Sequence, residues 1–318
     1  MNYYNEIKEE LLDNEINKKV KDYSKNKYEI QKYYNVGKLL LEAGNSYGEG
    51  IIKEYSIKLT KEIGKKYSVR YLFDIRKLYL FSKMHPVGAQ LTMSHYRLLF
   101  PWTDDNEINY YIDQIIKRNL SKRQLKEIIK LNEYKRLPED TKNKLSAKQE
   151  SNIIDFVKNP ILIKNSNNYN EISEKVLQRL ILEDISSFMK ELGNDFSFID
   201  SEYKINLGDR YNYIDLLLFN IEFNCYVVVE LKVTELKKEH IGQIQVYMNY
   251  IDNNLRKINQ DKTIGIIICK KENKYVIEYC SDEKIIAREY ELMWFCDIIK
   301  QRRIYRIWVN KKIGIIRH

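Results

Sequence analysis

The chain has 318 residues, of which 44% are hydrophobic and 31% charged, and its formal net charge is +9. These apolar side chains are enough for real hydrophobic cores, and the length suits two domains. No uninterrupted apolar run approaches the roughly 18 residues that a membrane helix needs, and the first residues, MNYYNEIKEELLDNE, are too polar and acidic for a signal peptide. We therefore expect a cytoplasmic protein with no membrane partner.

Nearly all of the excess positive charge lies in the first half of the chain. Residues 1–150 contain 29 Lys and Arg against 21 Asp and Glu, whereas residues 151–318 contain 25 against 24. Within the first half, residues 51–100 carry ten basic and three acidic side chains. Such a stretch is typical of a polyanion-binding surface, and equally of a solubilising surface in a Lys-rich chain. Charge alone leaves both interpretations open.

Residues 1–145 are expected to form a helical domain. Apolar residues recur three and four positions apart over 51–81, where Gly64 ends a first predicted helix and Ser68 caps a second. This helix-turn-helix pattern predicts that the second helix presents cations to DNA, from Arg70, Arg76 and Lys77. A helix pair that only packs is the alternative.

A change of composition that starts near residue 138 marks a connector, and we place the domain boundary near 145–170. From residue 138 to residue 170 the chain is rich in Lys, Asn, Ser and Pro, and we interpret 146–170 as a linker. A second domain, 171–318, opens with one predicted helix over 173–193 that Gly193 stops.

The elements that follow predict an α/β domain with a mixed sheet. Three strands come first, then a helix, then two more strands. Their ranges are 196–206, 212–220 and 225–233 for the first strands, 237–255 for the helix, and 263–269 and 275–280 for the last strands.

Two acids and a base interrupt the most apolar part of this domain. Glu230 and Lys232 are two residues apart in one predicted strand, so they project from the same face. If residues 221–224 form a hairpin loop, Asn220 pairs with Cys225 and Asp215 lies opposite Glu230 on that face. A divalent cation would remove the cost of burying two neighbouring carboxylates, and oxygen ligands favour Mg²⁺. A buried salt bridge of Lys232 to one acid is the alternative.

Asp215 and the run Glu230-Leu231-Lys232 resemble the D and E-x-K core of the PD-(D/E)XK nuclease superfamily, with Ile214 in place of the proline. The runs ELGNDFSFIDSEYKINLGDRYNYIDLLLFN, VVVELKV and EHIGQIQVYMNYID resemble the C-terminal domain of the bacterial YhcG-type nucleases. The runs YGEGIIKEYSIKLTKEIGKKYSVRYLFDIRKLYLF and LTMSHYRLL resemble the domain that precedes it in that family. The resemblance implies a restriction-endonuclease-like α/β domain, preceded by an all-α domain of helix-turn-helix or winged-helix type.

The resemblance also implies a metal site. Asp215 and Glu230 would hold Mg²⁺, or Mn²⁺ in its place, and Lys232 would orient or polarise the attacking water. A glutamate from the preceding helix commonly completes such sites, and Glu183 in LILED is the candidate, with Glu171 and Glu174 nearby.

Two further groups of residues resemble family elements. Gln243 and Tyr247, four apart on one predicted helix, resemble the Q-x-x-x-Y element of several branches, whose implied role is to bond the site or the DNA backbone. Packing is the alternative for Tyr247. His95, in MSHYRLL, matches a family-like motif that we interpret as packing or DNA contact. Residues 290–318 exceed the family outline and are expected as an extra element, a dimer contact or a basic surface.

The resulting hypothesis is a two-domain, Mg²⁺-dependent deoxyribonuclease. The helical half would bind DNA, and the α/β half would cut phosphodiester bonds as an endonuclease. The alternative, from a different class, is a nucleic-acid-binding or regulatory protein that keeps the fold without cutting. A homodimer would suit cleavage of both strands by subunits with one site each.

Overall fold

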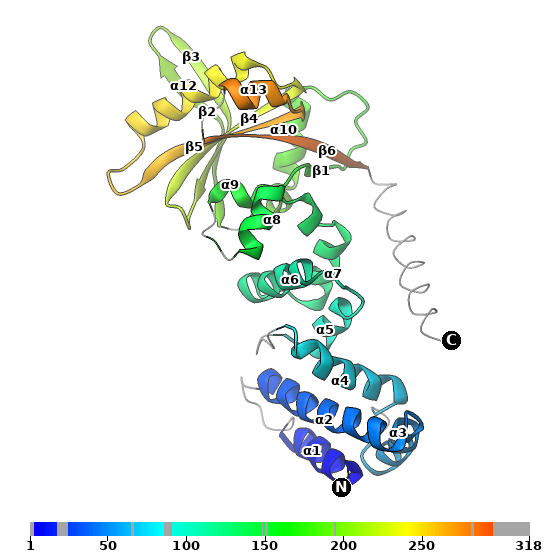
Figure 1. Ribbon diagram of the computed structural model, residues 1–318. Coiled ribbons are helices and arrows are strands. Elements are labelled where there is room, and N and C mark those ends of the chain that lie inside the picture. Colours follow the sequence, from blue (N-terminus) through cyan, green and yellow to red (C-terminus); the bar gives the residue numbers. More distant parts are fainter. Residues whose placement is uncertain are drawn as a thin grey trace. The chain divides into compact units, whose positions relative to one another are not determined.

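The computed structural model describes residues 3–17, 25–64, 67–85, 91–147, 149, 152–193, 195–280 and 283–294. The chain divides into two compact units, Met1–Tyr134 and Lys135–His318 (Figure 1). None of the described helices is both long enough and apolar enough to cross a membrane.

The described residues of the N-terminal unit form helices and no strand, so the all-helical prediction is confirmed and no wing is seen among them. Two of these helices, Gly50–Glu62 and Val69–Ser82, lie where the sequence predicts a helix pair. Ser68 caps the second of them by accepting a hydrogen bond from the Tyr71 amide, as predicted. The helices are α1 (Tyr3–Asn17), α2 (Lys25–Tyr47), α3 (Gly50–Glu62), α4 (Val69–Ser82), α5 (Met93–Leu99), α6 (Asp105–Arg118) and α7 (Lys122–Lys130), followed by a 3₁₀ turn, η1 (Tyr134–Arg136).

The C-terminal unit is built on one mixed sheet, as the sequence predicts. Its strand order is β1-β6-β5-β4-β3-β2, in which β1, β6, β5 and β4 run parallel and β3 and β2 continue antiparallel. Its elements are α8 (Glu139–Ser146), α9 (Ile153–Phe156), β1 (Ile161–Asn165), α10 (Glu174–Glu183), α11 (Ile185–Leu192), β2 (Phe196–Leu207), β3 (Arg210–Asn220), β4 (Cys225–Glu235), α12 (Lys238–Asn254), β5 (Asp261–Lys271), α13 (Lys274–Cys280) and β6 (Ile285–Trp294).

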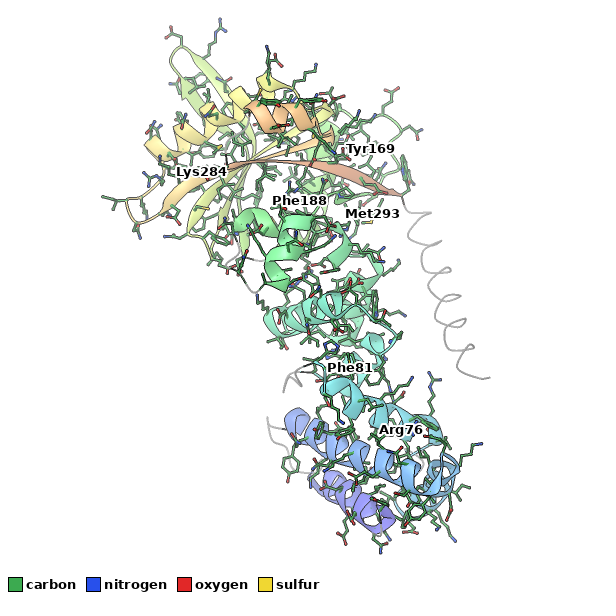
Figure 2. All side chains as sticks on the ribbon, in the orientation of Figure 1. Arg76, Phe81, Tyr169, Phe188, Lys284 and Met293 are labelled. Atoms are coloured by element: carbon green, nitrogen blue, oxygen red, sulfur yellow. The ribbon has the colours of Figure 1, made fainter. Side chains whose placement is uncertain are left out.

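Helices cover both faces of this sheet. Alternate residues of β4 divide between two cores, with Val227 and Val229 on the side of α10 and α11, and Val228 on the side of α12. Phe188 of α11 belongs to the first core (Figure 2). The predicted pairing of Asn220 with Cys225 is confirmed, and it fixes which residues of β3 and β4 lie opposite one another.

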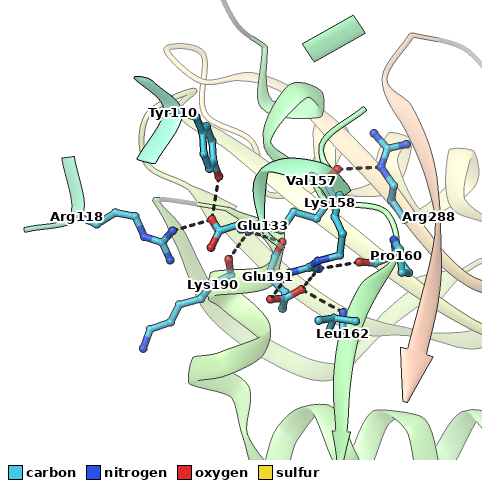
Figure 3. Close-up of polar contacts among 11 residues, drawn as sticks. Tyr110, Arg118, Glu133, Val157, Lys158, Pro160, Leu162, Lys190, Glu191 and Arg288 are labelled. Carbon is cyan, nitrogen blue, oxygen red and sulfur yellow. Dashed lines mark hydrogen bonds and ion pairs between the residues drawn. The ribbon is translucent and has the colours of Figure 1, made fainter. Parts of the chain in front are cut away.

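The segment expected as a linker is part of the C-terminal unit. Residues 146–170 contain β1, the edge strand beside β6, and the unit begins at Lys135 rather than near 145–170. Glu191 of α11 anchors this segment, because its carboxylate accepts from Arg136 and from the Leu162 amide (Figure 3). Lys158, buried nearby, donates to the Glu191 carbonyl at 3.1 Å.

Two predicted elements differ from the structure. The single helix over 173–193 is two helices, because the Asp184 carboxylate accepts from the Ser187 amide and starts α11 in a new direction. The strand predicted at 275–280 is wrong, since these residues form α13. β6 runs parallel to β5, so the chain must cross back over the sheet between them, and Asn273 caps the crossover helix by accepting from the Tyr275 and Val276 amides.

The expected C-terminal extension begins within β6. Residues 290–294 pair with β1 as part of a strand, which agrees with the expectation of an extra element. Residues 295–318 lie outside the described residues.

Candidate active site

The site lies where two strands of the sheet part. The pairing of β3 with β4 ends at Leu216 and Val229, and beyond this point β3 pairs only with β2 and β4 only with β5. Asp215 and Glu230 are the first residues past the fork. The Leu231 amide, which has no β3 carbonyl to bond, donates instead to the Asp215 carboxylate at 2.7 Å. The fork therefore directs the aspartate towards the start of Glu230-Leu231-Lys232.

Glu230 and Lys232 project together beneath this fork. Glu230 is only 1% exposed, and its Oε2 lies 3.2 Å from the Lys232 Nζ. Its other oxygen, Oε1, is buried without a hydrogen-bond partner. A buried acceptor left unpaired costs free energy, so this oxygen would be stabilised by a cation or a donor.

The charges of the three residues perturb one another. Burial, followed by the charge of Asp215, raises the pKa of Glu230 to about 8, against a smaller opposing effect of Lys232. Burial also raises the pKa of Asp215, although the Leu231 amide and Lys232 oppose it. Burial lowers the pKa of Lys232, but Glu230, Glu174 and Asp215 together leave it above its ordinary value. The pair of acids is thus short of positive charge despite the lysine.

The first turns of α10 complete this arrangement. Glu174 Oε2 lies 3.8 Å from the Lys232 Nζ, and Gln178, one turn later, donates to the Asp215 carbonyl at 3.0 Å. Glu183 is nine residues beyond Glu174, about 13 Å along the helix, and its carboxylate accepts from Asn167. The structure therefore brings Glu174, and not Glu183, to the site.

Gln243 and Tyr247 of α12 lie together on one helical face. The Gln243 amide donates to the Tyr247 hydroxyl at 3.0 Å, and the Tyr247 side chain is buried. Burial raises the pKa of Tyr247, and the Glu230 charge raises it further, so the ring lies within electrostatic reach of the site.

The two histidines near candidate motifs cap helices. Nδ1 of His240 accepts from the Lys237 amide at 3.2 Å, at the start of α12. Nδ1 of His95 accepts from the Thr92 amide at 3.2 Å in the same manner, at the start of α5. Burial lowers the pKa of both rings, and nearby lysines add to the effect.

Beside the fork, a hollow of about 420 Å³ opens between α10 and β2. Glu202 of β2 reaches it, and its charge is one of those that raise the pKa of Asp215. Sequence reasoning missed both Gln178 and Glu202. The four-residue spacing from Glu174 could have indicated Gln178, whereas Glu202 emerges only from the register of β2. The hollow is lined by Lys175, Gln178, Arg179, Leu182, Glu183, Ser201 and Glu202.

The donor set at the fork fits a hard divalent cation. The Asp215 carboxylate bonds the amide of Leu231, the neighbour of Glu230, its charge acts on Glu230, and the unpaired Oε1 of Glu230 is a ready acceptor. Within the described part of the chain, no three His, Cys, Asp or Glu side chains come together as ligands of one ion. Two carboxylates are enough for a hard divalent cation that keeps several waters.

In the N-terminal unit, the three predicted DNA-binding cations of α4 differ in their surroundings. Arg70 and Lys77 are exposed and seven residues apart, on one face of the helix. Arg76, labelled in Figure 2, is paired with Glu49 at 2.6 Å and lies over the Phe73 ring. Two of the three cations are therefore open to a ligand.

A mixed sheet with an aspartate at a strand fork and Glu-Leu-Lys on the neighbouring strand defines the C-terminal unit as a nuclease domain of the PD-(D/E)XK class. Residues 154–300 match the family model of the YhcG PDDEXK nuclease domain, and residues 9–136 match that of the DUF1016 N-terminal domain. The chain thus carries a DUF1016 N-terminal domain followed by a YhcG PDDEXK nuclease domain.

A curated relative and two solved structures are similar to this chain. "Putative nuclease YhcG" from Escherichia coli (strain K12) is 23% identical over 309 residues, which are 82% of each protein. A repair endonuclease from Pyrococcus abyssi is 21% identical with a TM-score of 0.27, covering 39% of this chain and 49% of that one. EndoMS in a complex with double-stranded DNA is 18% identical with a TM-score of 0.27, covering 40% and 48%. Each solved structure is thus matched over about half its length.

Proposed function

We propose that the protein is an endonuclease that uses a divalent metal ion to hydrolyse phosphodiester bonds in DNA. The observation that carries the proposal is the fork itself, where Asp215 and Glu230 converge beside Lys232 and leave the buried Oε1 of Glu230 without a partner. The nuclease domain supplies the reaction class, and the excess of basic residues in the N-terminal half favours a polyanionic substrate.

Asp215 and Glu230 would hold the metal, with Mg²⁺ the expected ion and Mn²⁺ a substitute. When bound, such an ion lowers the pKa of its water, positions the phosphate and offsets its developing charge. Its positive charge would also offset the burial and the Asp215 repulsion that together raise the pKa of Glu230.

The chain's own residues position and balance this centre. The Leu231 amide donates to the Asp215 carboxylate and orients it, while Gln178 donates to the Asp215 backbone carbonyl and holds this part of β3. Lys232 keeps its ammonium charge between Glu230 and Glu174, where it can orient the attacking water and stabilise negative charge on the phosphate. Gln243 and Tyr247 lie on α12, where the charge of Glu230 acts on the tyrosine, and they would bond the site or the DNA backbone.

The N-terminal unit would bind the DNA backbone through α4. Arg70 and Lys77 are exposed along one face, which supports phosphate contacts by both, whereas Arg76 already has Glu49 as its partner. Contacts of this kind add affinity without sequence preference.

A nuclease assay tests the proposal. Full-length protein is incubated with single-stranded, duplex and branched DNA, and with RNA, in Mg²⁺, Mn²⁺ or EDTA. We expect cleavage of DNA that needs the metal and is abolished by Asp215→Asn, while DNA binding is retained. Glu222→Gln, at the exposed β3–β4 turn, is the matched control and should cut normally. Cleavage by the Asp215 variant would refute the site, and binding without cleavage in every condition would favour a non-cleaving nucleic-acid-binding protein.

A further inference from the structure

Beyond the fork, β2 and β3 continue as a two-stranded arm of residues 203–214. The arm pairs from Tyr203 with Ile214 out to Leu207 with Arg210, and no third strand joins it among the described residues. In Figure 1 this hairpin projects past the rest of the sheet. Ile214, at the base of the arm, precedes Asp215 in the chain, so a ligand bound near this base lies next to the candidate active site.

The two faces of the arm differ in kind. Ile205 and Ile214 are fully buried and belong to the core on the α12 side, which anchors one face. The opposite face carries Tyr211 and Tyr213, two residues apart on β3, and they are 61% and 53% exposed. Tyr213 pairs with Lys204 across the strands, so these three side chains share that face.

This outer face combines aromatic rings with a cation. The Lys204 ammonium lies 3.6 Å from the centre of the Tyr211 ring, and neither tyrosine hydroxyl has a hydrogen-bond partner in the described structure. Solvated faces of antiparallel sheets are normally polar, whereas two adjacent exposed rings beside a lysine are the means by which proteins hold nucleic-acid bases and phosphates. The chemistry of the face is thus that of a nucleotide-stacking surface.

The position and composition of the outer face indicate which ligand it binds. Tyr213 is two residues from Asp215, about 6.8 Å along the strand, so a base beside the cleaved phosphodiester is within reach. Bases inside a duplex hide their faces in the stack, and only unpaired bases can stack on a protein ring. A second copy of the chain fits less well, because lysine is depleted from protein interfaces and Lys204 lies in the middle of this face.

We infer that Lys204, Tyr211 and Tyr213 form a stacking platform for unpaired nucleotides next to the site of cleavage. The inference rests on the proposed nuclease function and adds to it a substrate class, DNA with unpaired nucleotides beside the cut. Intact duplex would bind elsewhere on the protein and gain nothing from the platform.

Binding of fluorescently labelled DNA to the full chain tests the platform. Fluorescence anisotropy in EDTA, which prevents metal-dependent cleavage, compares a duplex carrying an unpaired tail with the same duplex made blunt. Tyr211→Ala with Tyr213→Ala should weaken binding of the tailed DNA about tenfold or more and leave the blunt duplex nearly unchanged. Changing both tyrosines to Phe should keep the affinity, because stacking needs only the ring. The matched control, Tyr275→Ala with Tyr279→Ala on α13, removes two tyrosines that are even more exposed and should have no effect.

A stacking contact also has its own signal. 2-Aminopurine placed in the tail should be quenched on binding to the wild type and to the Phe variant, but not to the Ala variant. Unchanged affinity and quenching in the Ala variant, or an equal loss on both DNAs, would overturn the inference. So would a shift of the Ala variant from dimer to monomer in size-exclusion chromatography. Because binding is measured without cleavage, failure of the platform and failure of the nuclease assay are separate results.

Discussion

Neutralising Glu230 should stabilise the metal-free fold. Glu230→Gln keeps the shape of the side chain and an oxygen that can accept from Lys232, but it removes a buried carboxyl whose pKa is raised from 4.5 to about 8. Between these two pH values the folded state binds a proton that the unfolded chain does not. The wild-type free energy of unfolding therefore falls as pH rises from about 4.5 to about 8, and the variant escapes this loss.

The size of the effect follows from the same shift. At about pH 7 the carboxyl must take up a proton on folding against an ordinary pKa of 4.5, which at about 1.4 kcal/mol per pH unit costs on the order of 3 kcal/mol. The Glu230→Gln variant avoids this cost, but it loses part of the resulting stability because the Gln amide attracts Lys232 less strongly than the carboxylate does. We expect Glu230→Gln to raise the free energy of unfolding by about 1 to 3 kcal/mol at about pH 8, and by almost nothing at about pH 4.5.

Urea denaturation in EDTA measures the free energy of unfolding. Hydrogen exchange of the β4 amides, used to monitor it, reports on the C-terminal unit alone. Glu222→Gln, exposed in the β3–β4 turn, should show no difference from wild type at either pH. A variant at Glu230 that is less stable than wild type at both pH values, or a stability difference that does not change with pH, would refute the reasoning. Added Mg²⁺ should stabilise the wild type and leave Glu230→Gln unchanged, since ligands stabilise only the state that binds them.

Three further changes have expected outcomes. Glu174→Gln should slow metal-dependent cleavage about tenfold, because it weakens the contact with Lys232, whereas Glu183→Gln, at the far end of α10, should cut at the wild-type rate in the same assay. Arg70→Ala with Lys77→Ala should flatten the plot of log binding constant against log salt concentration by about 1.8 for duplex DNA, and an unchanged slope would exclude α4 from the DNA contact. Gly265→Ala should destabilise the C-terminal unit by about 1 to 3 kcal/mol in thermal unfolding, because its Cβ would meet Met248 Sδ at 2.7 Å, and a wild-type Tm would show that α12 can shift away.

The predictions that succeeded rested on local rules. The hairpin loop of four residues set the pairing of Asn220 with Cys225, and this register placed Asp215 at the fork beside Glu230. The cap at Ser68 was likewise readable, because the interaction is confined to one turn of chain. Such features depend on neighbours a few residues away, which sequence patterns encode directly.

The predictions that differed from the structure depended on partners far along the chain. The run at 275–280 has the apolar and aromatic composition of a strand, but the parallel pairing of β5 with β6 requires a crossover there. Residues 146–170 have the composition of a linker, yet they contain β1, which pairs with β6 and whose Leu162 amide donates to Glu191 of α11. Glu174 and Glu183 lie at opposite ends of α10, and the packing of this helix against β4 decides which of them reaches Lys232, so helical periodicity alone could not select the glutamate.

Direct metal binding tests the central claim that Asp215 and Glu230 form a cation site. Isothermal titration of the full-length protein with Mn²⁺ should show saturable binding in the wild type, and the binding should be lost or strongly weakened in both Asp215→Asn and Glu230→Gln. Equal Mn²⁺ affinity in the wild type and in the two variants would contradict the account, because the metal would then be held elsewhere.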